Sequence, residues 1–129
     1  MNKAEYLTEL MKRDVEMINL TEKDIKSKHL KIIVELKEAE RKCEEYEKMY
    51  EGDDNRIMPA YIEYEKIRMP VTELEALLTD FKRNLIDHYE QLLIEKQVFT
   101  PEIEISLSKS RNNVLKLNET VEIIKGVLV

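Results

Sequence analysis

The thirty residues 21–50 constrain the fold of this chain more than any other stretch, because they contain neither glycine nor proline and repeat in heptads. Apolar side chains fill both seam positions with one exception, His29: the d positions hold Ile25, Ile32, Ala39 and Tyr46, and the a positions hold His29, Leu36, Cys43 and Tyr50. This spacing places one apolar stripe along a helix about 45 Å long. Such a stripe predicts a partner helix that covers it.

Composition agrees with a helical protein. The chain of 129 residues has the length of a single domain, and 37% of its residues are charged, with only two glycines and three prolines. No apolar run is long enough to span a membrane, so we expect no membrane partner. One cysteine excludes an internal disulfide and suits a reducing compartment, which favours a cytoplasmic location.

The net charge of −6 is acidic and is spread evenly when it is averaged over long segments. No segment builds the basic field that holds a phosphate backbone, so we expect no nucleic-acid partner. The densest lysine group is interleaved with Glu22 and Asp24, which is typical of a solvated helix face; it contains Lys23, Lys26, Lys28 and Lys31.

Two helices are predicted before the clearest loop of the chain. Residues 3–18 form an amphipathic pattern, and residues 21–51 carry the heptads, with Thr21 as a candidate cap between them. No glycine or proline forces a turn at this junction, so one continuous helix is the alternative. Gly52 is a suitable end for the long helix.

A third helix is predicted over residues 60–98, with a kink at Pro70, because proline removes a backbone hydrogen bond. The heptads resume at Val71, and the apolar face of residues 71–98 is wide enough for two neighbours. A short loop should fold this helix back antiparallel to the first, which makes residues 71–98 one candidate cover for the seam of residues 21–50.

The last helix is predicted over residues 101–126, because Thr100 and Pro101 form a strong helix start. Residues 102–107 alternate polar and apolar, which is also a strand pattern, but a lone strand would have no partner. The fold class predicted from these elements is all-α: an antiparallel bundle of three to four helices with a long coiled-coil-like hairpin.

Residues able to carry chemistry are sparse. Neither His29 nor His88 follows a glutamate three residues earlier, as in di-metal bundles; Lys26 and Leu85 stand there instead. Cys43 has no histidine within reach on its own helix. The sequence also lacks a glycine-rich phosphate loop and a serine-centred elbow. We therefore expect no catalytic residue, no metal site and no cofactor, and a protein that is not an enzyme.

Tyrosines and methionines gather around the loop at Gly52–Pro59. Both residue types are enriched at protein-binding surfaces, which makes this end of the hairpin a candidate partner site. The alternative is that these side chains cap the core where the helices diverge. The predicted partner-binding residues, called the tip residues below, are Tyr46, Met49, Tyr50, Ile57, Met58, Tyr61 and Tyr64.

The order of elements is similar to the layout of tubulin-binding cofactor A, a family of three-helix, non-enzymatic chaperones. The likeness covers residues 22–125 and rests on residues 37–49, the acidic loop, the helix interrupted at Met69-Pro70, and a further helix. The family's lysine- and glutamine-rich start of the second helix is absent here, where residues 61–64 read Tyr-Ile-Glu-Tyr, and the N-terminal helix is additional. Small export chaperones and phage-encoded inhibitors share the same general pattern, so no family is assigned.

These patterns predict a helical module that binds another protein, as a small chaperone or assembly adaptor. The alternative is a small inhibitor or ligand-sequestering protein that acts as an oligomer. Oligomeric state stays open, because the seam can be covered within one chain or in a homodimer.

Overall fold

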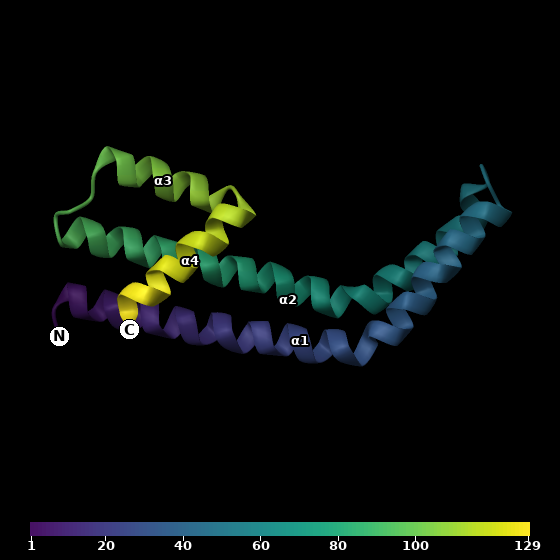
Figure 1. The fold of residues 1–129 in the computed structure, drawn as a ribbon, viewed down its shortest axis with the longest axis horizontal. Coiled ribbons are helices and arrows are strands. Elements are labelled where there is room, and N and C mark those ends of the chain that lie inside the picture. The colour runs from purple at the N-terminus through teal and green to yellow at the C-terminus, as the bar shows by residue number, and fades with distance from the viewer. The chain divides into compact units, whose positions relative to one another are not determined.

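The computed structural model describes residues 1–129 and confirms the all-α prediction. Its four helices are α1 (Lys3–Met49), α2 (Asp54–Glu95), α3 (Pro101–Arg111) and α4 (Val114–Leu128), and it contains no strand (Figure 1). None of these helices has an apolar stretch that could cross a membrane. The chain divides into unit 1, Met1–Thr21 with Leu77–Val129, and unit 2, Glu22–Ala76.

The two helices predicted for residues 3–18 and 21–51 form one continuous helix, α1. Thr21 does not act as a cap: its hydroxyl donates to the carbonyl of Met17 at 2.7 Å, and its side chain is buried. A threonine that bonds back to the preceding turn can stay inside a helix. Since residues 19–20 include neither glycine nor proline, the backbone pattern continues through them.

The loop between α1 and α2 is tighter than predicted. Gly52 has φ +82°, a conformation that glycine adopts without strain, and the Asp53 N–H donates to the Tyr50 carbonyl at 2.8 Å. The chain re-enters a helix at Asp54, six residues before the predicted start at 60. Both Pro59 and Pro70 lie inside α2, so the helix continues through the position of the predicted kink, as one helix over these residues requires.

Unit 2 is an antiparallel hairpin of α1 and α2, which run side by side to the loop (Figure 1). Lys42 Nζ lies 4.0 Å from Glu63 Oε2 across the pair. The buried apolar residues of this unit are small: Ala39, Cys43, Ala60 and Val71. The predicted antiparallel hairpin is confirmed. Of the candidate cover for the seam of 21–50, residues 71–76 belong to this unit and residues 77–98 belong to unit 1.

Unit 1 contains the hydrophobic core of the protein. The start of α1 runs antiparallel to the end of α2, with Lys3 Nζ 3.9 Å from Glu95 Oε2. Helices α3 and α4 add their apolar faces to this pair. The core residues are Leu7, Met11, Ile18, Leu85, Ile86, Leu92, Leu107, Leu117, Val121 and Ile124.

The single helix predicted over residues 101–126 is two helices, α3 and α4, with a break at Asn112 and Asn113. The Asn113 Oδ1 accepts from the Lys116 N–H at 3.1 Å and caps α4. Asparagine offers the backbone such local bonds, which compete with an uninterrupted helix. The start at Thr100 is confirmed, since its hydroxyl accepts from the Ile103 N–H at 3.2 Å. In Figure 1, α3 lies along α2 and α4 turns back across unit 1.

Candidate functional site

The seven tip residues all lie in unit 2 near the loop, but they do not form a single pocket. Tyr46, Tyr50, Ile57 and Tyr64 are half-buried against the hairpin. Met49 and Met58 are exposed, at 61% and 53%. The tip residues therefore include a packed part, as the core-capping interpretation predicts. They also include an open part, as the partner-site interpretation predicts.

Tyr46 and Tyr50 belong to the packed part. Their rings meet edge to face, with centroids 5.6 Å apart and an interplanar angle of 85°. The Arg56 guanidinium lies 5.3 Å from the centroid of the Tyr50 ring. Edge-to-face pairs and cation–π contacts stabilise the site where they form, so these two tyrosines brace the turn.

Tyr61, which is exposed, and Tyr64, which is half-buried, lie together on one side of the hairpin. They line a groove of about 260 Å³ on one side of the hairpin, with Cys43 in its wall. We call this the acidic tyrosine groove, because its other lining residues are all glutamates: Glu40, Glu44, Glu47 and Glu65. Neither tyrosine ring has a cation over it.

Charge is concentrated at this end of the hairpin. Residues 40–65 hold nine acidic and four basic side chains, which is −5 of the net charge of −6. The carboxylates that line the groove form no ion pair, whereas Glu38 and Glu45 on the same helix are held by Arg41 at 2.6 and 3.0 Å. The even distribution of charge along the sequence therefore does not describe the folded chain, because the hairpin brings two acidic segments side by side.

Cys43 lies in the negative electrostatic field of the same carboxylates. Its side chain is buried, as expected for a small apolar residue. Burial raises the pKa of the Cys43 thiol, and the neighbouring carboxylates, with Glu47 and Glu40 foremost, raise it further. A thiolate is therefore disfavoured at this position, and the groove is electronegative.

The spacing of the glutamates in the sequence is a signal for this acidic face. Glu40, Glu44, Glu47 and Glu51 follow the spacing i, i+4, i+7, i+11, which places them on one face of a helix. Their position beside Tyr61 and Tyr64 depends on the register of the hairpin, which the heptads alone do not determine.

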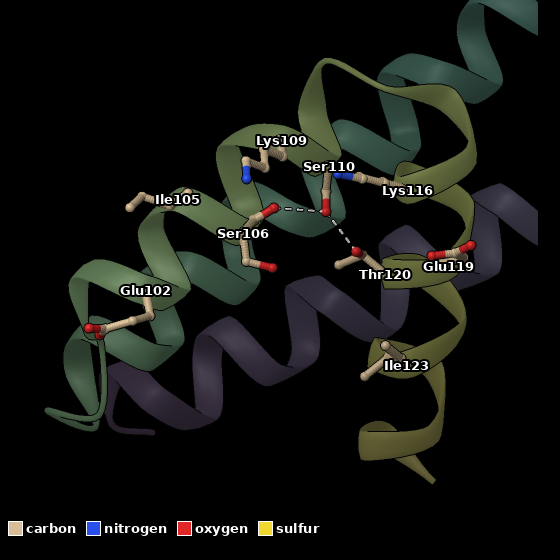
Figure 2. Close-up of a pocket in the computed structure, with 9 residues that line it drawn as sticks. All are labelled: Glu102, Ile105, Ser106, Lys109, Ser110, Lys116, Glu119, Thr120 and Ile123. Carbon is tan, nitrogen blue, oxygen red and sulfur yellow. Dashed lines mark hydrogen bonds between the residues drawn. The ribbon is translucent and has the colours of Figure 1, made fainter.

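A second groove lies in unit 1 between α3 and α4, and we call it the α3–α4 groove (Figure 2). Its volume is about 470 Å³, and its charged residues are of both signs: Glu102, Lys109, Lys116 and Glu119. At its base the hydroxyls of Ser110 and Thr120 lie 2.7 Å apart, and Ser110 Oγ donates to the Ser106 carbonyl at 3.0 Å. The two hydroxyls satisfy each other's hydrogen-bonding capacity, and this contact holds α3 and α4 together.

The histidines differ in their surroundings. His88 is partly buried, and its Nδ1 lies 2.6 Å from Asp14 Oδ2, as expected of a boundary histidine that makes one hydrogen bond. His29 is exposed. The structure contains no group of three or more histidine, cysteine, aspartate or glutamate side chains that could hold a metal ion.

No protein-family model, curated protein or solved structure matches this chain.

Proposed function

We propose that the protein is a non-enzymatic protein-binding module, a small chaperone or assembly adaptor, and that it binds its partner through the tip of the hairpin. The observation that carries this proposal is the exposure of large apolar and aromatic side chains near the loop of the hairpin. Met49, Met58, Tyr61 and Ile62 are 61%, 53%, 37% and 48% exposed.

Exposed apolar side chains that gather in one region are costly in water and are typical of interaction sites. Tyrosine and methionine add large contact area and adaptable packing. Unit 2 consists of only two helices, so each helix buries one side and leaves its other sides open. A helix or an extended segment of a partner can pack along these open sides.

The alternative is a small inhibitor or sequestering protein that acts as an oligomer. Leu30 and Val34 favour self-association, because they stand one turn apart on α1 and are 71% and 76% exposed. Light scattering after size-exclusion chromatography distinguishes the two proposals. A dimer that becomes a monomer on Leu30→Glu supports the alternative.

The tip proposal is tested by Tyr50→Ala and Tyr61→Ala, made separately. Tyr50 is braced by Tyr46 and Arg56, so its loss should lower the melting temperature. Tyr61 is more exposed, so its loss should leave the melting temperature nearly unchanged while it weakens capture of the partner from an extract of the source organism. Reduced stability of Tyr61→Ala without selective loss of a captured protein would contradict the tip proposal.

A further inference from the structure

We propose that the acidic tyrosine groove binds a basic segment of the partner protein, with an arginine or lysine side chain placed against Tyr61 and Tyr64 and among the groove's carboxylates. This inference rests on the proposed function and specifies the chemistry of the partner.

The size of the groove favours a side chain over a small-molecule ligand. Its volume of about 260 Å³ lies below the range of about 300–1,000 Å³ typical of small-molecule sites. The groove is open along one side of a two-helix hairpin. A long side chain that projects from a partner segment can therefore enter it while the segment lies along the hairpin.

The charge of the groove selects a cation. Glu40, Glu44 and Glu47 stand on one face of α1, and Glu65 faces the same groove from α2. Like charges at i, i+4 spacing destabilise a helix, and none of these carboxylates has an ion-pair partner within the chain. A guanidinium or ammonium group would relieve this repulsion, which gives a cationic partner a favourable free energy that a neutral partner lacks.

The aromatic rings add a second attraction. Arg56 already lies over Tyr50, which shows that a tyrosine at this end of the hairpin accepts a guanidinium. Tyr61 and Tyr64 offer further rings beside unpaired carboxylates. A cation that contacts an aromatic ring and carboxylates together is bound more tightly than by either alone.

Binding of three labelled synthetic peptides to the 129-residue chain tests this inference. The peptides share one length and one apolar face, and their polar positions carry arginine, glutamine or glutamate. We expect fluorescence anisotropy to show that the arginine peptide binds about tenfold more tightly than the glutamine peptide, and that added salt weakens it. We expect no binding of the glutamate peptide.

Variants locate the site. Glu44→Gln with Glu47→Gln, and separately Tyr61→Ala, should each weaken the arginine peptide about tenfold. The matched control is Glu102→Gln with Glu119→Gln, which removes the same charge from the α3–α4 groove and should leave the affinity unchanged. Circular dichroism of each variant verifies that it is folded.

Three results would overturn the inference: equal binding of the three peptides, no binding of the arginine peptide, or an equal loss of affinity in the control. The proposed function fails separately. If Tyr61→Ala loses a captured partner and the glutamine double variant retains it, the tip remains the partner site and its preference for a basic segment is wrong. If neither variant loses the partner, the proposal that the partner binds at the hairpin tip is wrong.

Discussion

Asp14 and His88 form a partly buried acid–base contact between α1 and α2 in unit 1, with His88 Nδ1 2.6 Å from Asp14 Oδ2. Burial raises the pKa of the Asp14 carboxyl above its ordinary value of 3.8, although the hydrogen bond to His88 acts in the opposite direction. Folding therefore disfavours the ionised form of Asp14. Its contribution to stability is fully present below the unfolded pKa and is lost as the pH rises through the higher folded pKa.

Asp14→Asn should for this reason raise the melting temperature at pH 7, because the amide keeps a hydrogen bond to His88 without a buried charge. The gain should shrink as the pH falls through the pKa of Asp14. Thermal unfolding followed by circular dichroism over a pH series measures both effects. Asp80→Asn, on an exposed part of α2, is the control, and a lower melting temperature of Asp14→Asn at pH 7 would mean that the contact with His88 outweighs burial.

Gln97 ends α2 in the left-handed conformation, at φ 59°. The Val98 N–H donates to the Leu93 carbonyl and the Gln97 N–H to the Ile94 carbonyl, both at 3.0 Å, as in a Schellman motif. Glycine takes this conformation without the steric cost that glutamine bears.

Gln97→Gly should therefore increase the free energy of unfolding by about 1 kcal/mol, after allowance for the greater freedom of glycine in the unfolded chain. Urea denaturation measures the change. Gln91→Gly, inside α2, should instead lower stability by about 1 kcal/mol. Equal losses in the two variants would show that the end of α2 carries no strain.

At the scale of elements, Arg111 links α3 to α2 through hydrogen bonds and ion pairs. Its Nε donates to Asp87 Oδ1 at 2.9 Å, its terminal nitrogen contacts the Glu90 carboxylate, and Arg83 Nε donates to the Arg111 carbonyl at 3.2 Å. Asp87 and Glu90 stand at i, i+3 on α2, so a single guanidinium can bind both. Without it, two carboxylates face each other beside the end of α3.

Arg111→Ala should lower the free energy of unfolding by about 1 kcal/mol, a value kept modest because the site is partly open to solvent. Chemical denaturation measures this change. Arg41→Ala removes a guanidinium that also bridges two carboxylates, but on a fully exposed face of α1, and should change stability little. If both variants lose the same stability, Arg111 does not fasten α3.

The strongest local signals, the start at Thr100 and the turn at Gly52, were predictable, and the longer-range register was not. Thr100 with Pro101 begins α3 as predicted, because a cap depends on neighbouring residues alone. Which residues of α2 cover residues 21–50 was left open, because both halves of α2 carry apolar side chains and only the tight turn around Gly52 decides between them. The break at Asn112 and Asn113 was missed because heptads resume on its far side.

The candidate site was predictable to the same extent. The tyrosines and methionines near the loop stand out by composition, and the structure places them at one end of unit 2. The carboxylates beside Tyr61 and Tyr64 were missed, because charge averaged along the chain hides what an antiparallel hairpin brings together.

At the scale of the whole molecule, all ten residues of the hydrophobic core cluster belong to unit 1. Unit 2 buries four small apolar residues, and two-helix hairpins with so little burial are marginal alone. Stability and partner binding are thus expected to reside in different units.

Replacement of residues 22–76 by a short glycine-containing loop should therefore leave a folded, cooperatively melting protein. A chain that ends at Gln97 should unfold, because it loses core residues such as Leu117 and Ile124. Circular dichroism and thermal melts compare the two. An unfolded loop variant beside a folded truncated chain would reverse the assignment of stability to unit 1.

Site-specific photocrosslinking tests most directly whether the hairpin tip binds the partner. The same photoreactive residue is placed at position 58, at the tip, and at position 123, in the α3–α4 groove, two exposed apolar positions in different units. Each protein is irradiated in an extract of the source organism, and adducts are identified by mass spectrometry. We predict a discrete protein adduct from position 58 that is absent from position 123 and is reduced by Tyr61→Ala. An adduct from position 123 alone, or the same adducts from both positions, would contradict partner binding at the tip.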